Sequence, residues 1–225
     1  MKKHMWKIVA GIVVVLMGGS ILYAQQAGKN ANEGVVLSEN IKGNQDSSVV
    51  LTEYADFQCP ACAQFYPIVK TIQEQYGDQL AIEFKHFPLV SIHPHALPAA
   101  KAAEAAGVQG KFFQMHDKLF ENQNSWSKSG TPQVFFNQYA EELGLDVALF
   151  KKHMRASMIE DKIREDMEGA LSKGFTGTPS FLLNGEVLEF ETYEEFISKI
   201  EAALGVTQAA SSTEETSSSE VNFGI

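Results

Sequence analysis

The chain has 225 residues, 44% of them hydrophobic, which is enough for one globular domain with a buried core. Its formal net charge is −10, and residues 33–206 alone carry 14 basic and 25 acidic side chains. Because an acidic surface repels phosphate backbones, this charge argues against nucleic acid as a partner.

The N-terminus combines lysines with a long uncharged segment. Three lysines precede residues 8–24, a run of 17 residues without charge, at the short end of what spans a bilayer. Basic residues before such a segment stay in the cytoplasm, so the rest of the chain would be exported. We predict that residues 1–24 are an uncleaved signal-anchor in the cytoplasmic membrane. A cleaved signal peptide, which would release a secreted form, is the alternative, although its candidate cleavage site Leu22-Tyr23-Ala24 contains a bulky residue.

Two polar segments frame the predicted domain. Residues 25–34 are expected to be a polar tether, and residues 207–225, rich in Ser, Thr and Glu, a disordered tail. The folded domain should therefore cover residues 35–206.

The first half of the domain has the pattern of a βαβ unit. Residues 35–37 and 49–54 are rich in β-formers and predict two strands. A helix is expected from Pro60 to Gly77, followed by a strand over residues 80–87. Strand, helix and strand at this spacing predict that 49–54 and 80–87 are parallel neighbours.

A helical stretch follows, over about residues 94–173. Glycines, a Thr131 cap and an Asp146 cap divide it into helices expected at 97–107, 110–122, 131–144, 147–157 and 159–173. The chain then returns to two strands joined by an Asn184-Gly185 hairpin turn, and to a last helix over 193–204. This order predicts an α/β fold, a mixed sheet interrupted by an all-helical insertion.

Both cysteines of the chain, Cys59 and Cys62, lie three residues apart, and three uses are open to them. A zinc site normally needs four ligands, and only His93 and His95, about thirty residues away, could add nitrogens. A structural disulfide closing about four residues would contribute roughly 2 kcal/mol, against about 4.7 kcal/mol for a hundred-residue loop.

A redox pair accounts best for where the cysteines lie. Residues i and i+3 share one helix face, and Cys59 falls at the helix N-terminus, where N–H groups and the helix dipole stabilise a thiolate. Cys62, one turn deeper, should remain a thiol and resolve a mixed disulfide.

Two further features fit that chemistry. Glu53 lies on the apolar face of the strand before Cys59, so a buried carboxylate with a raised pKa could relay the proton of Cys62. An ordinary exposed glutamate is the alternative. Pro179 opens a central strand, and a cis Thr178–Pro179 bond would leave backbone groups free for an extended substrate peptide.

Four stretches together resemble the DsbA-like family of exported thiol-disulfide oxidoreductases: LTEYADFQCPACAQF, FKHFPL, HPHALPAAKAAEAAGVQGKFFQMHDKLFENQNSW and GTPSFLLNG. The resemblance covers residues 35–204 and implies a thioredoxin fold with a helical domain inserted between its βαβ and ββα halves. It also implies unfolded exported proteins as substrates and a membrane redox partner of the DsbB type. No cofactor is expected, because the cysteines carry the electrons.

The same resemblance assigns roles to individual residues. It implies that Cys59 is the exposed nucleophile and Cys62 the resolving cysteine. Pro179 would be the cis-proline facing them, and Thr178 would contact substrate through its backbone. Glu53 occupies the family's buried acidic position.

One position departs from the family pattern. The best-known oxidases carry Pro-His between the cysteines, whereas this chain has Pro60-Ala61. Because Ala61 offers no side-chain charge or hydrogen bond, we expect a less depressed thiolate pKa and a less oxidising couple. A reductase or isomerase is therefore the alternative within the same fold. A holdase or metallochaperone is the alternative from another class.

The remaining polar and aromatic residues are expected to be structural. His86 should end its strand with a hydrogen bond to backbone, with an influence on Cys59 as the alternative, and His93 and His95 should order their loop. Asp56 would cap the turn into the helix, or else orient Cys59. Trp126 and its phenylalanine neighbours should form the core of the insertion, with an exposed fraction as a candidate apolar groove for substrates.

Overall fold

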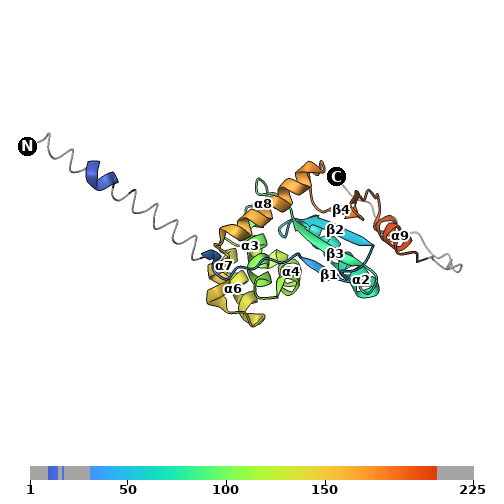
Figure 1. Cartoon of the computed structure of the whole chain (residues 1–225), viewed down its shortest axis with the longest axis horizontal. Coiled ribbons are helices and arrows are strands. Elements are labelled where there is room, and N and C mark those ends of the chain that lie inside the picture. Colours follow the sequence, from blue (N-terminus) through green and yellow to red (C-terminus); the bar gives the residue numbers. More distant parts are fainter. Residues whose placement is uncertain (1–9, 15–16, 18–30, 207–225) are drawn as a thin grey trace, which may run out of the picture. The chain divides into compact units, whose positions relative to one another are not determined.

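A computed structural model describes residues 10–14, 17 and 31–206 of the chain (Figure 1). Most of the predicted anchor at 1–24, the tether up to residue 30 and the tail at 207–225 lie outside the described residues. Of the helices in the described part, none has both the length and the apolar character needed to cross a membrane.

The last residues of the predicted tether contact the domain. Ala31 is 5% exposed, and Asn32 Nδ2 donates a hydrogen bond to Ser157 Oγ at 2.9 Å. The Glu33 carboxylate lies 3.2 Å from Lys152 Nζ. These contacts show that residues 31–33 are part of the packed structure.

The chain divides into two compact units, residues 1–189 and residues 190–225. The first contains a mixed five-stranded sheet in the order β1-β3-β2-β4-β5. Its strands are β1 (Ile41–Gly43), β2 (Val50–Ala55), β3 (Ala81–His86), β4 (Ser180–Leu183) and β5 (Glu186–Val187). β2 and β3 are parallel, as expected, and the other neighbouring pairs are antiparallel.

The predicted first strand is misplaced. Residues 35–37 form no strand, and the edge strand is β1, at Ile41–Gly43. Val35 is 7% exposed because it packs into the core of the helical insertion, whereas Val36 is 77% exposed. The apolar run at 35–37 therefore serves packing against helices and forms no sheet ladder.

Six helices lie between β3 and β4 and make up the predicted insertion. They are α3 (Ala96–Gly107), α4 (Phe112–Glu121), α5 (Gln123–Trp126), α6 (Pro132–Glu142), α7 (Val147–His153) and α8 (Ser157–Ser172). The alanines of α3 allow close helix contacts around the fully buried Trp126. Asp146 caps α7 through Leu149 N as expected, whereas Thr131 stands at the cap of α6 without a side-chain hydrogen bond.

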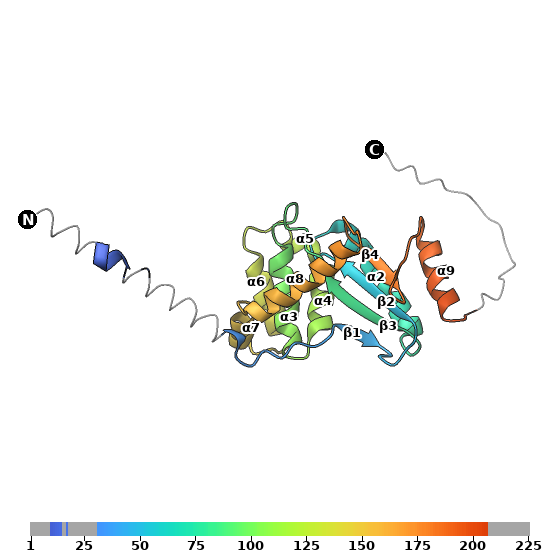
Figure 2. The ribbon, with the colours of Figure 1, turned by 45° about the horizontal axis from the view of Figure 1, so that its top comes forward.

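Helices cover both faces of the sheet (Figure 2). α2 (Pro60–Tyr76) follows β2, and α8 lies beside α3 and β3. Successive residues of a strand point to opposite faces. Glu53 shares a cavity with residues of α2, and Tyr54 lines a cleft with α8. α2 and α8 therefore cover opposite faces of β2.

The strand pair β4–β5 is joined as expected. Asn184 has φ 55° and Gly185 φ 87°, which are the backbone angles of a type I′ hairpin turn. In the second unit, α9 (Tyr193–Ala203) begins with Thr192, whose hydroxyl oxygen accepts a hydrogen bond from Glu195 N at 3.1 Å.

Candidate active site

The two cysteines lie on the first turn of α2, directly after the turn that follows β2. Cys59 is the N-cap residue, with extended backbone angles of φ −70° and ψ 123°. Pro60 occupies the first helical position, where a missing N–H removes no intrahelical bond. Both cysteines are free thiols.

Cys59 is less exposed than the family resemblance implies. Its exposed fraction is 7%, against 0% for Cys62. Thr178 covers part of it: Cys59 Sγ lies 3.3 Å from the carbonyl oxygen of Thr178, which accepts a hydrogen bond from the sulfur when Cys59 is protonated. Cys59 is nevertheless the more accessible sulfur of the pair.

The surroundings of the pair separate the two thiol pKa values. A hydrogen bond from the Cys62 thiol is the largest cause that lowers the pKa of Cys59, to about 5. The hydroxyl of Thr178 and the backbone N–H groups of Ala61 and Cys62 lower it further, against the effect of burial. Burial, in turn, raises the pKa of Cys62 well above its usual value. At neutral pH the pair therefore holds one thiolate, at Cys59, and one thiol, at Cys62.

Ala61 acts through its main chain. Its side chain offers no hydrogen bond, as the sequence shows, but its N–H at the start of α2 stabilises the Cys59 thiolate. The low pKa of Cys59 thus arises without a histidine between the cysteines. Sequence reasoning considered the side chain at this position and overlooked the backbone donor.

The loop before β4 brings Thr178 and Pro179 to the cysteines. The Thr178–Pro179 peptide bond is cis, as the family resemblance implied. β4 pairs antiparallel with β2, with Ser180 opposite Tyr54, so residues just before β4 reach the end of β2 where the active-site turn begins. The Thr178 hydroxyl is buried without a hydrogen-bond partner in the described part of the chain, and its proximity to Cys59 lowers the pKa of that thiol.

A buried glutamine of the insertion holds the cysteine turn in place. Gln123 Nε2 donates to the carbonyl oxygens of Phe57 and Cys59, at 2.8 and 2.9 Å. The Cys59 carbonyl also accepts the first hydrogen bond of α2, from Ala63 N at 3.2 Å, so Gln123 ties the turn before the helix to the helix itself. Sequence reasoning missed Gln123, because nothing in its local pattern indicates a partner more than sixty residues away.

Asp56 has the structural role that the sequence favoured. Its carboxylate accepts hydrogen bonds from Gln58 N at 2.7 Å and Leu89 N at 3.0 Å, and lies 2.6 Å from His93 Nδ1. His95 N donates to Gln58 Oε1 at 2.7 Å. His93 and His95 therefore order their loop against the active-site turn. In the described residues, no group of three or more His, Cys, Asp or Glu side chains is placed to hold a metal ion.

The prediction that the His86 ring forms a hydrogen bond to backbone is wrong. His86 Nε2 lies 2.8 Å from Glu104 Oε1, and both residues are almost fully buried, so a carboxylate of α3 takes the place of the expected backbone group. The helical insertion places the Glu104 carboxylate against the end of β3. The sequence of β3 alone does not reveal this neighbour.

Glu53 is buried, which contradicts the alternative of an exposed strand glutamate. It is 3% exposed, and its Oε1 has no hydrogen-bond partner in the described structure. Burial raises its pKa to about 7. The Glu53 carboxylate lines a small cavity of about 10 Å³, roughly the space of one water molecule. The charge of Glu53 also raises the pKa of Cys62, so the two groups interact.

Lys42 of β1 is a functional candidate that sequence reasoning missed. It lines the same cavity as Glu53, and its positive charge lowers the pKa of that carboxyl against the effect of burial. Burial lowers the pKa of Lys42 itself, and its Nζ lies 5.2 Å from the ring centre of Phe113. The misplaced first strand hid this contact, because Lys42 was expected to lie between strands.

The chain matches the family profile described as Thioredoxin over residues 37–202. It belongs to the thioredoxin family. Its fold is the DsbA-like form, in which a helical insertion interrupts the thioredoxin-like sheet.

Solved structures with this fold come from several bacteria. BdbD from Bacillus subtilis superposes with a TM-score of 0.65 at 22% identity, covering 77% of this chain and 95% of that one. A thioredoxin-like oxidoreductase from Silicibacter pomeroyi DSS-3 gives 0.63 at 24% identity, over 75% and 94%. Alpha-DsbA1 of Wolbachia pipientis gives 0.64 at 23% identity, over 76% and 93%. At these identities the likeness establishes the fold.

Curated relatives with higher identity are much longer proteins. One is named Na(+)/H(+) antiporter NhaA 1, from Mycobacterium sp. (strain KMS), and is 35% identical over 152 residues. Another protein of that name, from Salinispora arenicola (strain CNS-205), is 36% identical over 147 residues. The matches cover 66% and 65% of this chain but 24% and 22% of the relatives, so the chain spans about a quarter of their length.

The low pKa of Cys59 predicts a pH-dependent stability of the reduced protein. The thiol is ionised above about pH 5 in the folded state, but only near pH 9 in the unfolded chain, so the folded state binds fewer protons between these values. The stabilisation is complete above pH 9 and is lost as the pH falls through 5. We expect the free energy of unfolding of the reduced form, minus that of the oxidised form, to rise by about 2 kcal/mol from pH 5 to pH 7.

Denaturant unfolding of both redox forms at several pH values measures this difference. Glu53 titrates in the same range but is present in both forms, so its contribution largely cancels in the subtraction. A difference that stays constant from pH 5 to pH 7 would show that Cys59 is not ionised there.

The position of Lys42 predicts its effect on Glu53. Lys42→Met should raise the pKa of Glu53 above about 7, by roughly half a unit to one unit, because the carboxylate loses its one stabilising charge. Carboxyl ¹³C shifts in an NMR titration measure this pKa. Lys70→Met is the matched control, because Lys70 lines the same cavity but pairs with Glu121 at 3.1 Å. Equal shifts of the Glu53 pKa in the two variants would show that Lys42 has no specific effect on Glu53.

Proposed function

We propose that this protein is a thiol-disulfide oxidoreductase that forms disulfide bonds in exported proteins by exchange through Cys59 and Cys62. The observation that carries the proposal is the separation of the two thiol pKa values, about 5 for Cys59 and well above the usual value for Cys62. A thiol of low pKa leaves readily from a disulfide, and a buried thiol of high pKa stays protonated until it resolves one.

The proposed reaction begins with the oxidised pair. A substrate thiolate attacks Cys59 Sγ, the Cys59–Cys62 bond breaks, and Cys62 leaves and takes up a proton. A second substrate thiolate then attacks the substrate sulfur of the mixed disulfide, and Cys59 leaves as a thiolate. The substrate loses two electrons to the pair, so no cofactor is needed.

Three residues around the pair support this reaction. Thr178 and Pro179 face Cys59, and the backbone there would hold the extended substrate segment beside the sulfur. Glu53, with a pKa of about 7, is suited to exchange a proton near neutral pH. We propose that it supplies and removes the proton of Cys62 through water, since a cavity of about one water lies beside it.

The proposed location is the outer side of the cytoplasmic membrane. Its support is the lysine-flanked, uncharged segment at residues 8–24, which would anchor the chain once and place the domain on the extracytoplasmic side. Cleavage of this segment would give a secreted form. A membrane partner of the DsbB type would reoxidise the pair, and the substrates would be cysteine-containing exported proteins that are still unfolded or folding. Disulfides persist in that compartment.

A reductase or isomerase is the second candidate, and the absence of a histidine at Ala61 is what favours it. Equilibration of the full-length chain with graded glutathione buffers distinguishes the directions. A potential near about −120 mV supports an oxidase, and one near about −270 mV supports a reductase.

Cysteine variants test the exchange itself. Cys59→Ser should abolish oxidation of a reduced two-cysteine peptide, because the attacked sulfur is lost, whereas Cys62→Ser should accumulate a mixed disulfide that mass spectrometry detects. If the protein were instead a holdase, the Cys59→Ser variant would still bind unfolded substrates and protect them from aggregation. Oxidation by Cys59→Ser at the rate of the unmodified chain would refute the proposed mechanism, and binding of stoichiometric metal by the reduced protein would support a metallochaperone instead.

A further inference from the structure

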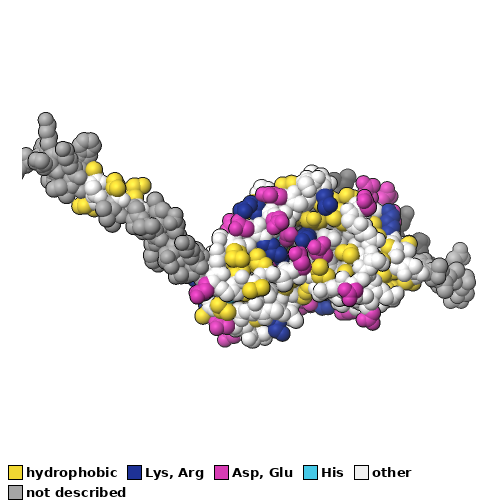
Figure 3. Space-filling model, viewed as in Figure 1, with side chains coloured by type: hydrophobic (Ala, Val, Ile, Leu, Met, Phe, Trp, Pro, Cys, Tyr) yellow, Lys and Arg dark blue, Asp and Glu magenta, His cyan; other side chains and the backbone are white. Residues whose placement is uncertain are grey.

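A cleft separate from the cysteines opens between α8, the sheet and the segment that leads to β1. Its volume is about 520 Å³, within the range of ligand-binding pockets. Residues 37–39, Tyr54 of β2, Lys85 of β3 and one side of α8 line it. Figure 3 shows acidic and basic side chains gathered on this face of the molecule. None of the residues proposed for disulfide exchange lines this cleft.

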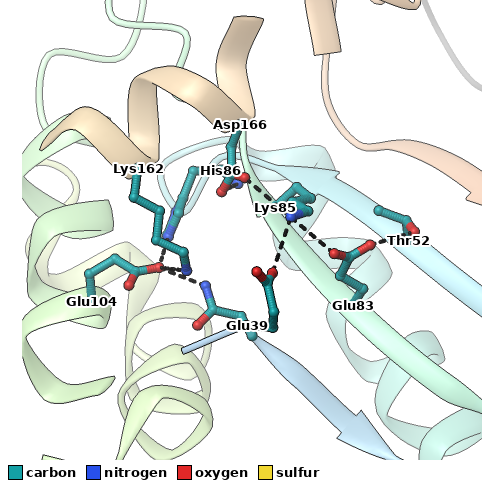
Figure 4. A network of polar contacts seen from close by, with 9 residues as sticks. Glu39, Thr52, Glu83, Lys85, His86, Glu104, Lys162 and Asp166 are labelled. Atoms are coloured by element: carbon teal, nitrogen blue, oxygen red, sulfur yellow. Dashed lines mark hydrogen bonds and ion pairs between the residues drawn. The ribbon is translucent and has the colours of Figure 1, made fainter. Parts of the chain in front are cut away.

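The two lysines of the cleft are already neutralised. Lys85 Nζ lies 3.0 Å from Glu83 Oε1, 3.4 Å from Glu39 Oε2 and 3.5 Å from Asp166 Oδ1. Figure 4 shows these carboxylates converging on the lysine. The floor of the cleft therefore offers no free positive charge through Lys85.

The second lysine is held in the same way. Lys162 Nζ lies 2.7 Å from Glu104 Oε1, an oxygen that also accepts a hydrogen bond from Asn40 Nδ2 at 2.6 Å and lies 2.8 Å from His86 Nε2 (Figure 4). Glu104 is almost fully buried, and His86 and Lys162 hold its pKa at about 2 despite its burial. Its permanent negative charge fixes Lys162 in place.

The lining as a whole is negative. Four acids line the cleft together with the two lysines: Glu39, Asp161, Glu165 and Asp166. Glu165 lies exposed on the rim, and its carboxylate has no ion-pair or hydrogen-bond partner in the described part of the chain. A carboxylate of this kind is available to a ligand.

A tyrosine hydroxyl also reaches this cleft from a side chain that is otherwise buried. Tyr54 is 5% exposed, and its hydroxyl makes no hydrogen bond within the described residues. Gly169 of α8 lies beside it, where a Cβ atom would stand 3.5 Å from the hydroxyl oxygen. Because Gly169 carries no side chain, the Tyr54 oxygen remains open to the cleft.

We propose that this cleft binds an arginine or lysine side chain of a polypeptide partner. The available groups are a free carboxylate and an unsatisfied hydroxyl oxygen within a net negative lining, which suits a cationic head with several N–H donors. Leu37 and Met158 form an apolar part of the lining that suits the aliphatic stem of such a side chain. The described residues offer no cluster of metal ligands that would favour an inorganic cation here.

The probe is the peptide acetyl-Gly-Arg-Gly-amide, added to the ¹⁵N-labelled full-length chain and followed by NMR. The neutral control is the same peptide with citrulline, which keeps the shape of arginine and lacks its charge. We expect saturable shifts at residues 37–39 and 161–169 with a dissociation constant on the order of 1 mM, and binding at least threefold weaker for the citrulline peptide. Comparable binding of the two peptides, or shifts confined to other regions, would overturn the proposal.

Variants test the two groups assigned to the ligand. Glu165→Gln and Tyr54→Phe should each weaken binding at least threefold; the first alters an exposed side chain, and the second keeps the buried ring. Glu168→Gln is the matched control, since it removes the same charge from α8 outside the cleft and should change binding less than 1.5-fold. Equal weakening by Glu165→Gln and Glu168→Gln would show a general charge effect and overturn the proposal. The measurement involves no disulfide exchange, so its outcome is independent of the proposed redox function.

Discussion

The stabilisation of a thiolate at Cys59 is the interaction on which the rest of the proposed activity depends. It requires Cys62 one helical turn away, so that the second thiol donates to the first, and the open N-terminus of α2, whose N–H groups point at the sulfur. A neutral thiol at Cys59 would be a poor nucleophile and a poor leaving group. The strand-to-helix junction therefore matters more than the identity of any single neighbouring side chain.

The surrounding structure keeps this junction in one geometry. Gln123 satisfies the two carbonyls before the helix, and Asp56 ties the turn to the loop after β3. Both contacts join the thioredoxin-like sheet to segments inserted between its halves. The helical insertion thus does more than cover the sheet, because its α5 contributes a buried side chain that positions the cysteine turn.

The two faces of β2 meet different arrangements of charged side chains. Glu53 points toward α2 and is buried beside a small cavity, and this burial, partly offset by the charge of Lys42, raises the pKa of its carboxyl to about 7. The next residue, Tyr54, points toward α8 and a cleft of dense ion pairs. A weakly charged face suits proton transfer to Cys62, and a strongly charged face suits recognition of a charged group.

Local sequence patterns predicted most of the fold. The βαβ order, the Asn184-Gly185 hairpin and the position of Cys59 before a helix depend on short-range preferences, and the structure has all three. Contacts between distant segments were beyond such patterns. The strand at 41–43, the Glu104 partner of His86, and the roles of Gln123 and Lys42 each arise where the insertion or an edge strand meets the sheet. The backbone donor at Ala61 was missed because sequence reasoning weighed side chains.

The central claim is tested most directly by the thiolate absorbance of the reduced full-length chain near 240 nm, measured as a function of pH with Cys59→Ser as the blank. The account predicts a single transition with a midpoint at about pH 5, absent in the variant. A midpoint at the ordinary thiol value, between about 8 and 9, would contradict it.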